Sequence, residues 1–150
     1  MADYKAVRYT EDKIKSFQPV YDDFRSRAVT DYNFELEPLS YDDFVDSVRK
    51  GLINCIILLD SDIPVGFLIY TTMISEAIEL NIIHSLNNED YLVRSKCLIK
   101  EFLEETAYMR RKKIVCYPML GEQKKLVGAI ARYGFKFICM YNMKIISAHI

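Results

Sequence analysis

The sequence LINCIILLDSDIPVGFLIY, residues 52–70, decides the fold class. Its two arms, Leu52 to Leu59 and Ile63 to Tyr70, are apolar and rich in β-branched and aromatic residues, which is typical of strands buried on both faces. Between them, Asp60-Ser61-Asp62 is a short polar segment of residues that favour turns. The stretch therefore predicts a hairpin of two buried antiparallel strands.

One strand and two helices are expected before this hairpin. Tyr4 to Tyr9 has the length and composition of a short strand. Thr10 is a candidate N-cap for the first helix, which we expect to be broken or restarted at Pro19 because proline lacks the amide hydrogen that a helix interior uses. The second helix is marked by Ser40 as its N-cap and Gly51 as its stop.

The elements expected after the hairpin alternate between strand and helix until a second hairpin closes the chain. They are a strand over Ala77 to Ile83, a long helix that opens at Asn87 to Asp90 and has Arg110 to Lys113 in its last turn, a strand over Ile114 to Leu120, a helix over Gln123 to Tyr133, and strands over Phe135 to Cys139 and Asn142 to Ile146. This order predicts an α+β fold with a mixed, mostly antiparallel sheet of about seven strands, flanked by about four helices. A chain of 150 residues, 51% of them apolar, is expected to form one domain, residues 1–150.

Composition and charge narrow the class of protein. Twenty basic and 21 acidic residues give a net charge of −1, which does not support nucleic-acid binding by a basic surface.

The four cysteines are far apart and no Cys/His spacing suits zinc, so we expect reduced core cysteines and no metal site. No apolar run resembles a signal peptide or could span a bilayer, so we expect a cytoplasmic protein without a membrane partner. Eleven tyrosines leave enough aromatic surface for a homodimer contact.

Two local patterns, together with the element order, carry a resemblance to a known family. Residues 130–137, IARYGFKF, combine a helix end with a Gly-Phe entry into a strand, and Val65-Gly66-Phe67 lies in the second strand of the hairpin. With these features the chain resembles the GNAT superfamily of N-acetyltransferases over nearly its whole length. The resemblance implies transfer of an acetyl group from the co-substrate acetyl-CoA to an amine of a small molecule or peptide, by direct attack.

The resemblance also implies a segment of the form Q/R-x-x-G-x-G/A between the fourth strand and the following helix. Its backbone amides would face the coenzyme A pyrophosphate, because helix N-termini favour anions. The alignment places on this segment Arg94, Ser95, Lys96, Cys97, Leu98 and Ile99. Cys97 and Ile99 stand where the family has glycine, which predicts a degenerate or rebuilt loop. Further cofactor contacts are expected from Ile82 and Ile83 on the preceding strand and from Lys124 near the adenosine 3′-phosphate, although Lys124 can also be a solvated surface charge.

Three residues are candidates for catalysis. The acceptor amine must lose a proton, and Glu79, on the strand that resembles the family's fourth, matches the family's base in residue type and place. Glu79 can equally be a solvated carboxylate on the open face of the sheet. His84, just after that strand, is an alternative base or a hydrogen-bonding residue of the loop. The tyrosine acid that the family places at the position of Ile130 is absent, so Tyr117 is its candidate replacement unless Tyr117 belongs to the core.

Three readings of the function remain open at this point. The first is an acetyl-CoA-dependent N-acetyltransferase with Glu79 as base through a water molecule. The second is a catalytically inactive GNAT-fold protein with a binding or regulatory role, which the departures at Cys97, Ile99 and Ile130 motivate. The third is a structural domain of another α+β topology. The sequence does not identify the acceptor.

Overall fold

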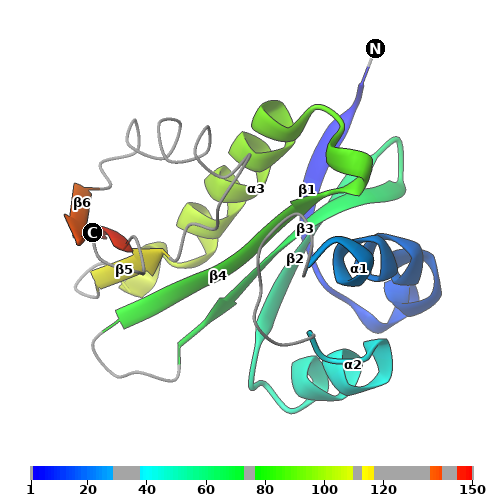
Figure 1. Cartoon of the computed structure of the whole chain (residues 1–150), viewed down its shortest axis with the longest axis horizontal. Coiled ribbons are helices and arrows are strands. Elements are labelled where there is room, and N and C mark those ends of the chain that lie inside the picture. Colours follow the sequence, from blue (N-terminus) through cyan, green and yellow to red (C-terminus); the bar gives the residue numbers. More distant parts are fainter. Residues whose placement is uncertain are drawn as a thin grey trace.

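The computed structural model describes residues 2–28, 38–72, 77–109, 113–116, 136–139 and 145–149. Helices and strands are labelled as in Figure 1, and η denotes a short 3₁₀ turn. In chain order they are β1 (Tyr4–Arg8), η1 (Glu11–Lys13), α1 (Ile14–Ala28), α2 (Tyr41–Arg49), β2 (Asn54–Asp60), β3 (Ile63–Thr71), β4 (Ala77–Ser85), η2 (Leu86–Asn88), α3 (Tyr91–Glu105), η3 (Ala107–Met109), β5 (Lys113–Cys116), β6 (Lys136–Cys139) and β7 (Ile145–His149).

The strands form one seven-stranded sheet in the order β1-β2-β3-β4-β5-β7-β6. Every neighbouring pair is antiparallel except β4 and β5, which are parallel. Helix α3 packs on one face of the sheet, and α1 and α2 pack on the other (Figure 1). The predicted α+β class and the mostly antiparallel sheet are therefore confirmed. The helix predicted over Gln123 to Tyr133 lies outside the described residues.

The β2–β3 hairpin forms as predicted. Ser61 and Asp62 connect the strands with φ angles of 49° and 71°, as a two-residue hairpin turn requires. Residues of both strands pack alternately under α3 and under α1 and α2, except at Val65, where the β2–β3 register shifts and both Val65 and Leu68 pack under α3. Burial on both faces is the physical reason for the unbroken apolar runs in the sequence.

Strand β4 contains a β-bulge at Asn81. Ile69 pairs with Ile82 and Tyr70 with Leu80, so Asn81 is the extra residue. Ile78 and Leu80 pack under α3, and the bulge shifts the alternation so that Ile83 packs there too. The ladder between β4 and β5 covers only Ala77–Leu80 of β4, and it therefore ends just before the bulge.

Two predictions about the first helices have different outcomes. The break expected at Pro19 is wrong, because α1 is one helix that contains this proline. Burial of Phe17, Val20, Tyr21, Phe24 and Ala28 outweighs the single backbone hydrogen bond that proline removes. The caps of α2 are confirmed, since Ser40 Oγ accepts from the Asp43 amide at 3.2 Å and Gly51 takes a φ of 73° after the helix.

The predicted end of the long helix is wrong. Helix α3 ends at Glu105, and Thr106 closes it by donating from both its amide and its hydroxyl to the Phe102 carbonyl. The last turn of α3 therefore precedes the predicted basic run, of which only Lys113 is described, as the first residue of β5. The second hairpin is present as β6 and β7, and the predicted strand residues 142–144 lie outside the described residues.

Candidate functional site

The turn between β4 and α3, residues 86–90, lies at the carboxyl end of β4. Asn87, Asn88 and Asp90 take φ angles of 56°, 57° and 48°, in the left-handed region. Asn and Asp are the side chains that tolerate this region best, so the turn reaches it without glycine. The positive end of the α3 dipole faces the turn, which makes this a place where an anion would be favoured.

Helix α3 begins earlier than the alignment with the family segment requires. Asp90 is its N-cap, and the Arg94 amide already donates to the Asp90 carbonyl at 3.0 Å. Residues 95–99 lie inside the helix, where amides bond to carbonyls four residues earlier. The amides available at the helix start belong to its first turn, which includes Leu92 and Val93. Residues 94–99, the predicted cradle, therefore begin about one helical turn after the N-cap, and their contact with a cofactor stays a prediction.

Arg94 is buried and points into the protein. Its Nη1 donates to Ser85 Oγ at 3.0 Å and to the carbonyls of Val65 and Leu86 at 3.3 and 3.4 Å. Its Nε donates to the Tyr4 hydroxyl at 3.1 Å. One guanidinium thus joins β1, β3, the end of β4 and α3. These contacts give Arg94 a structural role, and its predicted cofactor contact stays a prediction.

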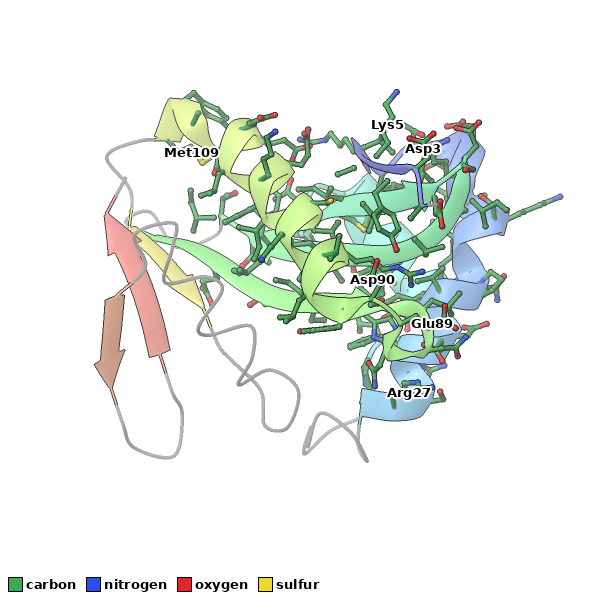
Figure 2. The ribbon with its side chains drawn as sticks, turned by 90° about the horizontal axis from the view of Figure 1, so that it is seen from above. Asp3, Lys5, Arg27, Glu89, Asp90 and Met109 are labelled. Atoms are coloured by element: carbon green, nitrogen blue, oxygen red, sulfur yellow. The ribbon has the colours of Figure 1, made fainter. Side chains whose placement is uncertain are left out.

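Two carboxylates occupy the start of α3 (Figure 2). Glu89 and Asp90 are both exposed, and Asp90 accepts a hydrogen bond from the Tyr4 hydroxyl at 2.7 Å. The nearest guanidinium, that of Arg94, is turned inward, and its Nη2 is 3.9 Å from the Glu89 carboxylate. A diphosphate would be favoured by the helix dipole and opposed by these two charges, so the described residues fit it only in part.

His84 is completely buried in the layer between β4 and α1. Its ring lies 5.6 Å from the rings of Phe24 and Phe67, and its Nε2 is 2.8 Å from Asp23 Oδ2. A catalytic base must reach the proton that it removes. A ring without exposed surface does not reach a substrate in this structure, so the position of His84 supports the structural alternative.

Asp23, on α1, is a residue that the sequence did not single out. Its Oδ2 accepts from the Asn87 amide at 3.0 Å as well as contacting His84, and its Oδ1 accepts from Arg27 Nε at 3.1 Å. Burial raises the pKa of Asp23, but the hydrogen bonds from Asn87, His84 and Arg27 outweigh burial and hold the pKa below its ordinary value. No sequence pattern reveals this group, because His84 and Asn87 are 61 and 64 residues away from Asp23.

The predicted strand residues lie on either side of the bulge. Glu79 is half-buried and precedes it, opposite Thr71 on β3. Asn81 donates to Thr71 Oγ1 at 3.2 Å and to the Glu79 carbonyl at 3.4 Å. Ile82 packs against the cluster under α1 and α2, whereas Ile83 belongs to the cluster under α3. Because both side chains pack inside the protein, Ile82 and Ile83 offer mainly their backbone to a ligand.

The other predicted residues are not gathered at this site. Leu98 and Ile99 have no exposed surface and pack in the core, and burial raises the pKa of the half-buried Cys97 thiol. Ser95 is also buried, and Lys96 is half-buried in the second turn of α3. Tyr117 and Lys124 lie outside the described residues.

A pocket of about 300 Å³ lies away from this turn, at the start of β2, between the segment after β1 and the end of α2. Its two arginines already have partners. Arg49 donates to both carboxylate oxygens of Glu11 at 2.7 and 2.9 Å, and Arg8 donates to Asn54 Oδ1 at 3.2 Å. In the described part of the chain, no helix has the length and apolar character needed to cross a membrane.

The sequence matches no protein-family model and no curated protein. Solved structures do resemble the chain. PaiA N-acetyltransferase from Thermoplasma acidophilum, in complex with coenzyme A, has a TM-score of 0.66 and 10% identity, with 99% of this chain and 99% of that chain covered. An acetyltransferase-like protein from Acinetobacter baylyi has a TM-score of 0.77 and 12% identity, with 100% and 94% covered. YncA from Salmonella typhimurium, with acetyl-CoA, has a TM-score of 0.76 and 6% identity, with 97% and 93% covered.

These structures cover 97–100% of the chain, and two further matches, from Staphylococcus aureus and Desulfovibrio desulfuricans, are described as acetyltransferases of the GNAT family. At identities of 6–12%, the similarity establishes the fold and does not assign roles to individual residues. The chain therefore has the GNAT fold, as its element order predicted.

Proposed function

We propose that this chain is an N-acetyltransferase that uses acetyl-CoA to acetylate an amine of a small molecule or peptide. The observation that carries the proposal is the geometry at the carboxyl end of β4. Strand β4 pairs antiparallel with β3 and parallel with β5, the β4–β5 ladder ends at Leu80 before the Asn81 bulge, and α3 begins after a tight turn beyond the strand's end. Ligands of open sheets bind beyond the carboxyl ends of parallel strands, where the topology switches.

The residues at this end have complementary proposed roles. The first-turn amides of α3, including those of Leu92 and Val93, would face the pyrophosphate, and the backbone of Ile82 and Ile83 would face the acyl arm. Bound acetyl-CoA supplies the acyl group. Glu79 would take the proton from the attacking amine through a water molecule. The proposal keeps Tyr117 as the proton donor to the departing thiolate and Lys124 as the contact of the 3′-phosphate.

The proton and bond changes of the proposed transfer balance without a further reactant. The amine nitrogen forms a bond to the acyl carbon and the carbon–sulfur bond breaks. The proton that the amine loses passes to Glu79, and the thiolate receives one proton from Tyr117 or water. Solved neighbours with coenzyme A or acetyl-CoA bound support the choice of acyl donor.

Calorimetric titration with acetyl-CoA and with free coenzyme A is the first test. We expect a dissociation constant between about 1 µM and about 1 mM, which is the usual range for enzyme substrates. Release of free thiol from acetyl-CoA, followed with a panel of primary amines, then tests transfer. Absence of binding at about 1 mM of either ligand would refute the proposal.

A variant pair tests the proposed base. Glu79→Gln should reduce turnover by about 100-fold or more while the affinity for coenzyme A stays near that of the wild type. Glu104→Gln is the matched control, because Glu104 is exposed near the far end of α3. Equal turnover of the two variants would remove Glu79 from the mechanism.

A second candidate is a GNAT-fold binding protein without transfer activity. The observation that favours it is the pair of carboxylates, Glu89 and Asp90, at the helix start whose nearest guanidinium is turned inward. Coenzyme A binding without thiol release for any amine would favour this candidate. For the same reason, Glu89→Gln should tighten coenzyme A binding in either case, since it removes a negative charge beside the proposed pyrophosphate position.

A further inference from the structure

The turn at residues 86–90 adopts a demanding backbone conformation. Three of its residues, Asn87, Asn88 and Asp90, have left-handed φ angles. Left-handed conformations of residues other than glycine persist where the surrounding structure fixes them, and they cluster at functional sites. The contacts that fix this turn come from both faces of the sheet.

On the α1 face, Asp23 fixes the first half of the turn. One of its carboxylate oxygens, Oδ2, accepts from the Asn87 amide at 3.0 Å and contacts His84 Nε2 at 2.8 Å. The second oxygen accepts from Arg27 Nε at 3.1 Å, which fixes the carboxylate on its own helix. The His84 ring is packed between two aromatic rings and has no exposed surface. The Asp23 carboxylate therefore contacts the buried His84 ring on β4 and the amide of Asn87, a residue with a left-handed φ angle in the turn.

On the α3 face, Arg94 and Ser85 fix the second half. Arg94 Nη1 donates to Ser85 Oγ and to the Leu86 carbonyl, and the Ser85 hydroxyl donates to the Glu89 carbonyl. Arg94 belongs to α3, so these bonds place the start of the helix relative to the turn. Asp23 supplies the corresponding restraint from the other face.

We propose that Asp23 is a positioning residue for ligand binding at the start of α3. It holds the Asn87 amide, so the turn and the first-turn amides of α3 keep the arrangement that a ligand meets. Asp23 acts through Asn87 and its own carboxylate touches neither Leu92 nor Val93. This role rests on the proposed function in one respect, namely that acetyl-CoA binds at the start of α3.

The substitution Asp23→Asn removes the charge and one of the two acceptor oxygens with little change of shape. One oxygen cannot serve Arg27 on one side and both Asn87 and His84 on the other. We expect the Asn87 amide and the first-turn amides of α3 to exchange hydrogen at least about tenfold faster, because their local opening becomes easier. We expect coenzyme A to bind about tenfold more weakly, which corresponds to the loss of one hydrogen bond to a charged group.

Two control variants separate positioning from general stability. Asp22→Asn changes the neighbouring carboxylate of α1, which is exposed, and should leave exchange and affinity unchanged. Val45→Ala truncates a buried residue of α2 and lowers the melting temperature through core packing. It should leave the exchange of residues 87–93 and the affinity for coenzyme A unchanged at a temperature where the protein is folded. Asp23→Ala gives a second measurement of the same loss.

The experiment distinguishes the failure of each proposal. Absence of coenzyme A binding to the wild type would overturn the proposed function. Hydrogen exchange needs no ligand, so in that case it would still test whether Asp23 holds the turn. Exchange and affinity in Asp23→Asn equal to those in Asp22→Asn would overturn the positioning role. The positioning role also fails if Asp23→Asn and Val45→Ala weaken binding in proportion to their loss of melting temperature, because Asp23 would then act only through stability.

Discussion

Replacing Arg94 with methionine distinguishes a structural arginine from one that contacts a ligand. Arg94→Met keeps an unbranched side chain in place of the arginine alkyl chain and removes every side-chain N–H donor, while the backbone amide still donates to the Asp90 carbonyl. Ser85 Oγ, the carbonyls of Val65 and Leu86, and the Tyr4 hydroxyl all lose the donor that they have now.

The magnitude follows from those four contacts and from burial. A hydrogen bond to a charged group contributes about 1.5–3 kcal/mol, but bonds within one network do not add. The burial of a guanidinium is itself unfavourable, and its removal returns part of the loss. We therefore expect a net decrease of about 3 kcal/mol in the free energy of unfolding. For a chain of this length the decrease lowers the melting temperature by about 6–12 °C.

Urea and thermal unfolding of Arg94→Met, compared with Arg8→Met, measure this effect. The Arg8 side chain is 62% exposed, so its replacement should change the unfolding free energy by less than about 1 kcal/mol. A stable Arg94→Met protein that binds coenzyme A more than about tenfold more weakly would refute the structural reasoning. In that case Arg94 would contact the ligand, as the alignment predicted.

Three further predictions concern stability. Gly66→Ala should lower the free energy of unfolding by about 1–3 kcal/mol, because the new Cβ would lie 2.7 Å from the His84 carbonyl oxygen. Gly51→Ala places its Cβ where no atom lies within 4 Å, so it should lower the free energy of unfolding by only about 1 kcal/mol, through its positive φ. Equal urea midpoints of the two variants would contradict this. Ser40→Ala should lose about 1 kcal/mol with its cap, and circular dichroism should detect earlier melting. The pKa of Asp23 in the folded protein is below its ordinary 3.8, so the stability that the ionised carboxylate contributes is present above pH 3.8 and is lost as the pH falls through the folded pKa. The difference in unfolding free energy between wild type and Asp23→Asn should therefore shrink between pH 7 and pH 2 in urea titrations.

Much of the fold could be predicted from short stretches. The Ser61-Asp62 turn and the Ser40 cap depend on residues within a few positions of each other, so the sequence contains the whole interaction. Predictions that depended on distant packing were less accurate. Pro19 signals a helix break locally, yet α1 continues because its buried residues pack against the sheet.

The candidate site was predictable in its place and less so in its residues. The end of β4 and the opening of α3 after Asn87 to Asp90 followed from the element order, whereas the alignment of the family segment depended on Arg94. The run Asn87 to Asp90 marked the helix start in the sequence, and its Asn and Asp residues take left-handed positions at 87, 88 and 90. Asp23 gave no signal at all.

The sequence by itself determined the element types, the hairpin with two buried faces and the GNAT order, because periodicity, caps and turn residues act over a few positions along the chain. Only the tertiary structure decided which way the polar side chains of the site face. Arg94 turns inward to Tyr4, 90 residues away, and Asp23 reaches His84 and Asn87 across the layer between helix and sheet. A buried charge takes the orientation that satisfies its hydrogen bonds, and for these residues the partners come together only when the sheet has formed.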